Sequence, residues 1–452
     1  MKMKNIPIIA ILTVFLVLIQ SCSKENNEPI QETPILKNEN MVAKTLWYTG
    51  WASIPSIMSM PYGELRNSLI SSLHDKCNQP LVSLQKMNDP DLCWAAMMYK
   101  FLFDAGIFTA EQLLTMTLDD ERNAVIELNT TLTGLPASGF QAKNNARNLI
   151  VAYEQWFHQN SSTRQKIDKL NGVTSGSPTF NLKDDKNFVM DVLRIVKADE
   201  VYTYLGVYHA MANTNQFKLY LAGSNDLKTW TNLTELGDRA HQGDIKKWGN
   251  GYLVTNEQDP VQGTNNIRIR YYSSYAGLVA NTPSNDKSIP QTFSNLAEGT
   301  PDIRIIEGNA PSSSHILIGY HYYENGIHDQ QAFGILRNFN EWRTWKDEPA
   351  NFTTREMGYR GNIGGRSAFF HSGNFVLQEA QITPGDWSSW RLLFGNGVFY
   401  YTLHPETALG STSFANPGIV EIEPGRFAVT SFLPSQGNHS RENGELLYTI
   451  RF

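Results

Sequence analysis

The second half of the chain repeats one short pattern five times. Each copy joins small or polar residues, several of them carboxylates, to a short apolar run typical of a β-strand. The spacings between copies are 53, 58, 62 and 52 residues, which suits four short strands with their turns. The copies are anchored at Asp191, Asp244, Asp302, Gly364 and Asn416. Because radial repetition of four-stranded sheets builds a propeller, this spacing predicts a five-bladed β-propeller over residues 180–452.

Further strands are expected where turns such as Gly-Asn-Gly, Ser-Gly-Asn and Pro-Gly-Arg precede apolar runs, a pattern that favours hairpins. A β-sandwich is the alternative all-β fold, but it gives no reason to repeat one pattern five times. The segment from Ser224 to Trp230 resembles an outer blade turn of five-bladed glycoside hydrolases. We expect Asp226 to cap this turn and Trp230 to pack between blades.

Residues 43–172 carry a different pattern, an internal repeat with a shift of 56 residues and no gap. Each copy opens with a hydroxyl residue and acidic residues, which together mark a helix start. Leu65, Leu69, Ile70 and Leu73 then follow at helical spacing. The fold class expected for the chain is therefore a small α-helical repeat domain followed by an all-β propeller, with a linker at residues 175–178.

The first 22 residues predict a targeting segment. Lys2 and Lys4 precede an apolar run that ends before Cys22, a layout typical of a secretory signal. The residues before Cys22 resemble the bacterial lipobox, and residues 23–28 resemble an export tag of surface lipoproteins. This resemblance implies an acylated (palmitate-bearing) Cys22, a flexible tether over residues 23–42, and an outer-membrane lipoprotein that can face the cell surface. The alternative is an uncleaved anchor with a chance cysteine.

Composition excludes some classes of partner and cofactor. The net charge of −6, without a long Lys/Arg run, argues against nucleic-acid binding. Cys77 and Cys93 either pair or remain free thiols, and neither lies near a histidine cluster, so we predict no metal and no cofactor. The sequence gives no indication of the oligomeric state.

Four carboxylates lie near predicted inner strands: Asp191, Asp244, Glu298 and Asp302. The inner strands of a propeller start at one end of its channel, so these side chains are expected to meet there. Like charges in a partly dry pocket push their pKa values apart. One carboxyl can then act as an acid and another as a base or nucleophile, as glycoside cleavage requires. The alternative is that each carboxylate caps a turn or pairs with an arginine.

The phrases around Asp191, Asp244 and Glu298 resemble those of the five-bladed furanosidase superfamily, glycoside hydrolase families 43 and 32. This resemblance covers about the last 270 residues. It implies that Asp191 attacks or activates water, that Asp244 orients the sugar and stabilises the transition state, and that Glu298 is the acid/base. Thr300 is an extra residue relative to the family phrase. In a family-43 alignment Asp302 modulates the pKa of the acid, and the acid itself is missing unless Glu379 substitutes for it.

Arg366, His371 and Asn416, with Asp302, are candidate substrate-binding residues, and Trp248 and Trp387 are candidate stacking surfaces. The sequence therefore predicts a glycoside hydrolase that acts on a polysaccharide or oligosaccharide. Two alternatives remain open. One is a glycan-binding lipoprotein without catalysis, and the other is a structural envelope protein whose helical repeat recruits a partner.

Overall fold

The computed structural model describes residues 42, 45–46, 49, 51–77, 81–87, 92, 96, 161–211, 216–261, 264–324, 328–372, 374–397 and 400–452. The chain divides into two compact units, Met1–Gln159 and Asn160–Phe452. The predicted signal segment, Cys22, residues 23–41 of the predicted tether and the second helical copy lie outside the described residues. Among the residues described, no helix is long and apolar enough to cross a membrane.

The described part of the first unit is helical, with α3 (Ile54–Ser59), α4 (Tyr62–Cys77) and α5 (Leu81–Lys86). Ser53 caps α3 by accepting a hydrogen bond from the Ser56 amide. The four apolar positions that the sequence predicted for one helix face are buried along α4: Leu65, Leu69, Ile70 and Leu73. Arg66 donates to the Met87 carbonyl at 2.5 Å, which ties α4 to the end of α5.

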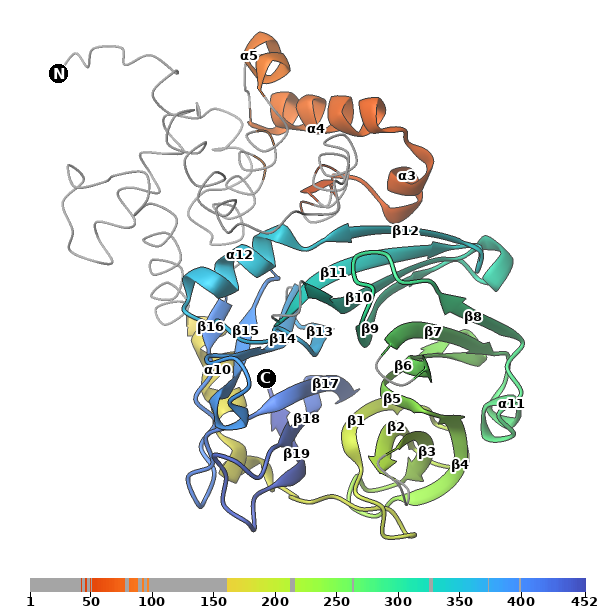
Figure 1. The fold of residues 1–452 in the computed structure, drawn as a ribbon, viewed down its shortest axis with the longest axis vertical. Coiled ribbons are helices and arrows are strands. Elements are labelled where there is room, and N and C mark those ends of the chain that lie inside the picture. Colours follow the sequence, from red (N-terminus) through yellow and green to blue (C-terminus); the bar gives the residue numbers. More distant parts are fainter. Residues whose placement is uncertain are drawn as a thin grey trace, which may run out of the picture. The chain divides into compact units, whose positions relative to one another are not determined.

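The second unit is the five-bladed β-propeller that the repeat predicted (Figure 1). In each blade the strands pair antiparallel in chain order, with the first strand innermost. The blades are β1 (Asp191–Lys197), β2 (Tyr204–Met211), β3 (Phe217–Ser224) and β4 (Thr231–Asp238); β5 (Ala240–Trp248), β6 (Gly251–Val261), β7 (Thr264–Tyr272) and β8 (Asn285–Ile289); β9 (Glu298–Glu307), β10 (His315–Glu324), β11 (His328–Arg337) and β12 (Glu341–Lys346); β13 (Arg366–Phe370), β14 (Asn374–Gln381), β15 (Trp390–Gly395) and β16 (Tyr400–Thr402); and β17 (Ala415–Glu423), β18 (Arg426–Leu433) and β19 (Gly444–Arg451).

The fifth blade is completed by the segment that enters the propeller. Its own sheet has three strands, and Thr179 pairs with Leu447 on the outer one. Thr179 and Leu447 exchange backbone hydrogen bonds of 2.8 and 2.9 Å, and the Leu182 amide donates to the Glu445 carbonyl at 3.1 Å. The two ends of the propeller sequence are thus joined in one blade, which closes the ring.

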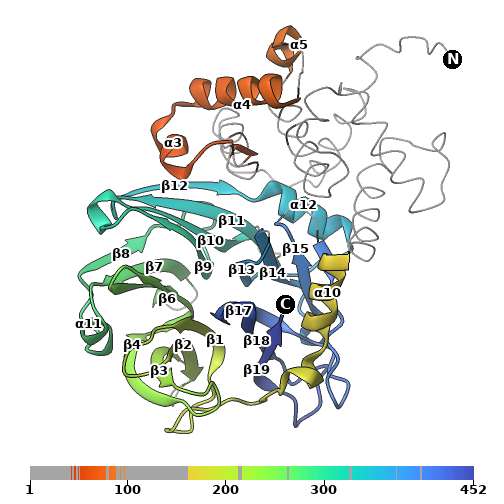
Figure 2. The same cartoon turned by 180° about the vertical axis from the view of Figure 1, so that it is seen from behind.

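Short helices connect and cover the sheets. The helix α12 (Glu348–Glu356) links the third and fourth blades and contacts β11, and α11 (Tyr275–Val279) contacts β6 and β7. The helix α10 (Ser161–Asn171) contacts β19, as does the one-turn helix η3 (Val173–Gly176). Figure 2 shows α10 beside the fourth and fifth blades from the opposite side. The remaining single turns are η4 (Pro311–Ser313) and η5 (Trp387–Ser389).

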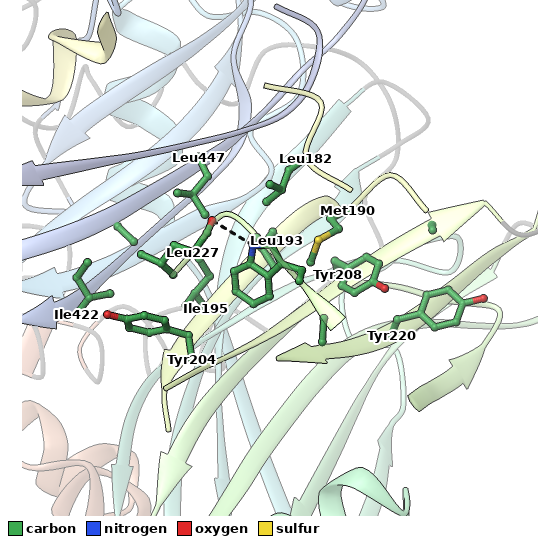
Figure 3. Close-up of a cluster of buried hydrophobic side chains, with 14 residues drawn as sticks. Leu182, Met190, Leu193, Ile195, Tyr204, Tyr208, Tyr220, Leu227, Ile422 and Leu447 are labelled. Carbon is green, nitrogen blue, oxygen red and sulfur yellow. Dashed lines mark hydrogen bonds between the residues drawn. The ribbon is translucent and has the colours of Figure 1, made fainter. Parts of the chain in front are cut away.

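The outer turn of the first blade has the structural role that the sequence predicted. Asp226 accepts hydrogen bonds from the Lys228 and Thr229 amides at 2.9 and 2.8 Å, and these bonds lower its pKa to about 2. Trp230 is buried among residues of the first and fifth blades, including Leu193 and Leu447 (Figure 3). Its indole N–H donates to the Leu227 carbonyl at 3.2 Å. This tryptophan therefore stabilises the contact between two blades.

Four inner strands begin with the same β-bulge. The bulge residue has a positive φ in each case: Val192 (56°), Gln242 (51°), Thr300 (46°) and Asn416 (48°). The residue before each bulge pairs with the second strand of its blade. Thr300, which the sequence comparison treated as an insertion, is thus a regular feature of this propeller.

The register corrects the sequence-based alignment of the blades. Asp191 shares its position with His241 and Gly299, the residues that precede the bulges. Asp244 and Asp302 share a position with each other, after the bulge. The sequence pattern placed all three aspartates at one position because a bulge adds a residue without changing the apolar run that follows.

Candidate active site

The inner strands all begin at one end of the channel, which we call the mouth. It is formed by the bulge residues, by the residues that precede them, and by the ends of the second strands. The polar second-strand side chains at this level are His209, Glu257, His321 and Glu379. They come from four different blades and are all buried.

Side chains at the mouth bind the bulge of the following blade. Glu445 accepts from the amides of Val192 and Leu193 at 2.9 and 3.2 Å. In the next blades His209 accepts from Gln242 at 3.2 Å, Glu257 from Thr300 at 2.9 Å, and Glu379 from Asn416. These bonds stabilise a backbone conformation that non-glycine residues rarely adopt. One function of the polar ring is therefore to hold neighbouring blades together.

Asp191 differs from these residues because no donor is bound to its Oδ1 atom. The side chain is partly buried at the start of β1, and Oδ1 has no hydrogen-bond partner among the described residues. Burial raises its pKa to about 6. Such a carboxylate has a free lone pair and changes its charge in the range that acid–base catalysis uses.

Asp244 lies inside the channel rather than at the mouth. Its Oδ2 accepts from the Ile303 amide at 2.7 Å, and its Oδ1 accepts from the Ile245 amide at 2.9 Å. The side chain therefore joins β5 to β9, the inner strand of the next blade. It also lines a small cavity together with Arg194, Lys246 and Thr430.

Glu298 turns toward the loop before β9. Its Oε1 accepts from the backbone amides of Thr292, Phe293 and Ser294, and the Thr292 hydroxyl lies 3.2 Å from its Oε2. Burial raises its pKa, and the hydrogen bonds of the amides oppose that rise. With three amides bound to one oxygen, this carboxylate is an anchor of the loop.

Asp302 and Arg366 form a buried ion pair between the third and fourth blades. Arg366 Nε lies 3.4 Å from Asp302, and Arg366 Nη1 donates to Asp347 at 2.9 Å. Arg304 contacts the other oxygen of Asp302. The Arg366 guanidinium also lies 4.3 Å from the centre of the Phe333 ring. These two predicted substrate-binding residues are thus engaged by protein groups.

The remaining predicted residues are spread over the propeller. His371 follows the far end of β13 and packs against Phe427 and Phe452, at the opposite end of the strand from the mouth. Asn416 lies at the mouth, and its buried Oδ1 has no partner among the residues that the structure describes. Trp248 is buried and donates to the Gly308 carbonyl at 2.8 Å, whereas Trp387 is 52% exposed.

Glu379 fills the space that two glycines leave in the fourth blade. A Cβ at Gly364 would overlap its carboxyl group, and Gly365 donates its amide to Oε1. Burial raises the pKa of Glu379 to about 7, although the amides of Asn416 and Gly365 oppose the rise. A carboxyl group thus occupies the fourth-blade position at which the sequence offered only Gly-Gly-Arg.

A second polar cluster, in the second and third blades, was not expected from the sequence. His241 Nε2 lies 3.2 Å from Asp259 and 3.7 Å from Glu257. Burial lowers the pKa of His241, but the two carboxylates outweigh this effect and raise it overall. Burial alone would raise the pKa of Glu257, and the charges of His241 and His321 lower it. Among the described residues, His241, Glu257 and Asp259 are the set whose spacing could hold a metal ion.

A local signal for these residues exists in the sequence. His209 and His321 are polar residues within largely apolar strands, and Glu257 and Glu379 follow shortly after the apolar runs 252–254 and 375–377. A polar residue that must be buried needs a partner, so such positions indicate an inter-blade bond or a site. These four residues lie on second strands, whereas the carboxylates predicted from the sequence lie on first strands.

Comparisons with known proteins give structural neighbours only. No family model matches the chain, and no curated protein matches it. Solved structures that it resembles include a thermostable family-43 glycoside hydrolase, with 12% identity, a TM-score of 0.40, and coverage of 60% of this chain and 92% of the other. The endo-arabinanase of Bacillus licheniformis has 11% identity, a TM-score of 0.40, and coverage of 60% and 96%. The endo-arabinase of Bacteroides thetaiotaomicron has 12% identity, a TM-score of 0.40, and coverage of 61% and 97%. The number of blades follows from the strand pairing and does not depend on these similarities.

Proposed function

We propose that the propeller is a glycoside hydrolase that binds an oligosaccharide or polysaccharide at the mouth. The observation that carries this proposal is Asp191, a partly buried carboxylate with a raised pKa and with an oxygen that no described residue binds. Within the part of the chain that the structure describes, Asn416 Oδ1 and His321 Nδ1 are also buried without partners. Unpartnered buried polar atoms are rare in proteins, and a sugar supplies both donors and acceptors that would satisfy them.

In this proposal Asp191 is the base or nucleophile and Glu379 is the acid. The pKa of about 6 leaves Asp191 largely ionised at neutral pH, and the pKa of about 7 leaves about half of Glu379 protonated. Ionised Asp191 takes a proton from water or attacks the anomeric carbon, and protonated Glu379 gives its proton to the departing oxygen. Glu298 is not assigned the acid role because three backbone amides hold it against its loop.

The test is activity on arabinan, xylan and fructan fragments for three matched substitutions. We expect Asp191→Asn and Glu379→Gln each to lower kcat/KM by about 100-fold or more. The folded fraction of Glu298→Gln should keep the kcat/KM of the unmodified protein. The rate of the unmodified protein should fall as the pH drops below about 6, as Asp191 gains its proton. Unchanged rates in both Asp191→Asn and Glu379→Gln would contradict the proposal.

A second candidate is a glycan-binding propeller without catalysis. It is favoured by the hydrogen bonds of Glu379 itself, because both of its oxygens accept backbone amides that a general acid must release or share. This candidate predicts saturable binding of the same fragments with no release of sugar. Binding that is lost in Asn416→Ala, in the absence of any turnover, would support it.

We further propose that the chain is a lipoprotein of the outer membrane, acylated at Cys22. The support is the apolar run that ends before this cysteine and the polar residues that follow it. The unmodified chain should incorporate labelled palmitate and sediment with membranes, and Cys22→Ala should do neither. A Cys22→Ala chain that still carries the label would contradict the acylation site.

A further inference from the structure

The second blade contains three potential metal ligands that are already in place. His241 lies near the start of β5, and Glu257 is its cross-strand partner on β6. Asp259 lies two residues after Glu257, on the same face of β6. Their ligand atoms all lie within 4.8 Å of one another, with His241 Nε2 to Asp259 Oδ2 at 3.2 Å. Two ligands of a tetrahedral ion at about 2.0–2.1 Å are roughly 3.3 Å apart, so this spacing needs little rearrangement.

One oxygen of the cluster has no donor. Asp259 Oδ1 is a buried atom without a hydrogen-bond partner among the residues that the structure describes. A divalent cation satisfies such an oxygen, because metal ions bind the lone pairs of carboxylate oxygens and of imidazole nitrogens.

A fourth side chain is buried beside the cluster with an unused nitrogen. His321 is 7% exposed, and its Nδ1 has no partner among the described residues. It is the cross-strand partner of Gly299, whose missing side chain leaves room for the Glu257 carboxyl group. Glu257 Oε2 accepts a hydrogen bond from the Thr300 amide at 2.9 Å, and the Asn265 side chain donates to Glu257 Oε1. Bonds of this kind orient a carboxylate toward a metal ion.

We propose that His241, Glu257 and Asp259 bind one divalent transition-metal cation of the Zn²⁺ type. An imidazole nitrogen with two carboxylates suits such an ion better than Ca²⁺, which takes six to eight oxygen ligands. Three protein ligands leave at least one coordination position for water or for a hydroxyl group of a bound molecule. The ion also offsets two carboxylate charges that a single histidine cannot balance. This inference does not rest on the glycosidase proposal.

The test is metal binding by the full chain after chelator treatment, measured by equilibrium dialysis with Zn²⁺ and by the visible absorption of Co²⁺. We expect one ion per chain, with a Co²⁺ spectrum typical of low coordination and competition by Zn²⁺ but not by Ca²⁺. Asp259→Asn and His241→Ala should each weaken binding by about 100-fold or more, since even outer partners of a metal contribute about 10-fold to 100-fold. Binding should also raise the Tm of the unmodified protein but not that of Asp259→Asn.

Two variants far from the cluster are the matched controls. His371→Ala removes a histidine at the opposite end of an inner strand, and Asp286→Asn removes an aspartate that pairs with Arg268 at the outer edge of the second blade. Both should bind the ion as the unmodified chain does. Asp259 is partly exposed, and the Asn side chain has the same shape, so Asp259→Asn is expected to fold. This variant still tests metal binding by the cluster if His241→Ala fails to fold. No ion at one equivalent, equal binding by Asp259→Asn, or binding of Ca²⁺ alone would overturn the proposal.

Discussion

Asp191 at the start of β1 and Glu298 at the start of β9 are carboxylates at the same end of two inner strands, yet their surroundings are opposite. Glu298 is 1% exposed and accepts hydrogen bonds from three consecutive amides. Asp191 is partly buried, and no described residue donates a hydrogen bond to its Oδ1. Burial raises the pKa of both. The difference teaches that desolvation alone does not identify a reactive carboxylate, because the same shift accompanies a structural anchor.

The Asp191 and Glu298 carboxylates differ in the free oxygen of Asp191. Substitution of each carboxylate is therefore the most direct test of this comparison. The largest expected effect is on catalysis. Asp191→Asn should lower kcat/KM by about 1,000-fold, which corresponds to about 4 kcal/mol of transition-state stabilisation. The measurement is the initial rate of sugar release from the fragment that the unmodified protein cleaves fastest. A rate within a few-fold of the unmodified value would remove the distinction between Asp191 and Glu298.

The second effect is on stability. Glu298→Ala leaves three amides of the 292–294 loop without their acceptor, and we expect the free energy of unfolding to fall by about 3 kcal/mol. Urea unfolding measures this change. The control is Glu307→Ala, at the other end of β9. Its free energy of unfolding should fall by less than about 0.5 kcal/mol. Equal losses in both variants would show that the loop does not depend on Glu298.

A smaller effect is expected on the pH dependence of folding stability, because ionised Asp191 is unfavourable in its partly buried position. Its folded-state pKa of about 6 lies above the usual value of 3.8, so folding stability is full below pH 4 and falls as the pH rises through 6. Asp191→Asn should therefore be more stable than the unmodified protein at pH 8, by about 2–3 kcal/mol, and equally stable at pH 3.5. Urea midpoints at the two pH values measure this. A variant that is less stable at pH 8 would indicate that the carboxylate has a partner.

The smallest effect is expected at His371, which serves as the distant reference. Its ring packs edge-on against Phe427 at 5.7 Å between centroids, away from the mouth. His371→Ala should lower the free energy of unfolding by about 1 kcal/mol and leave the affinity for oligosaccharide unchanged. Isothermal titration with the bound fragment checks the second point. A loss of sugar affinity would place a binding surface at the opposite end of the channel.

The fold was predictable because its signal is periodic. Turn residues and apolar runs at intervals of 52 to 62 residues indicated five sheets, and the strand pairing confirms five. The turn at Asp226 and the tryptophan at Trp230 also have the expected roles, since a cap depends only on residues two or three positions away. Local chemistry was sufficient in both cases.

The candidate site was predictable only in part. Asp191, a predicted catalytic residue, and Asn416, a predicted substrate-binding residue, lie at the mouth, and each has an oxygen without a hydrogen-bond partner among the described residues. Asp302 and Arg366 are instead paired with each other, and Glu298 is bound to its own loop. The sequence did not show these partners, because Asp302 and Arg366 meet across two blades. A single bulge residue was also sufficient to shift the alignment of Asp191 relative to Asp244 and Asp302.

The sequence by itself determined the number of blades, the approximate course of each inner strand, and the set of carboxylates near these strands. The tertiary structure alone decided which carboxylates are satisfied by backbone amides and which are left free, and it added Glu379 and the His241 cluster from the second strands. The physical reason is that strand periodicity arises from neighbours along the chain, whereas the hydrogen bonds of a buried carboxylate come from whichever blade packs against it.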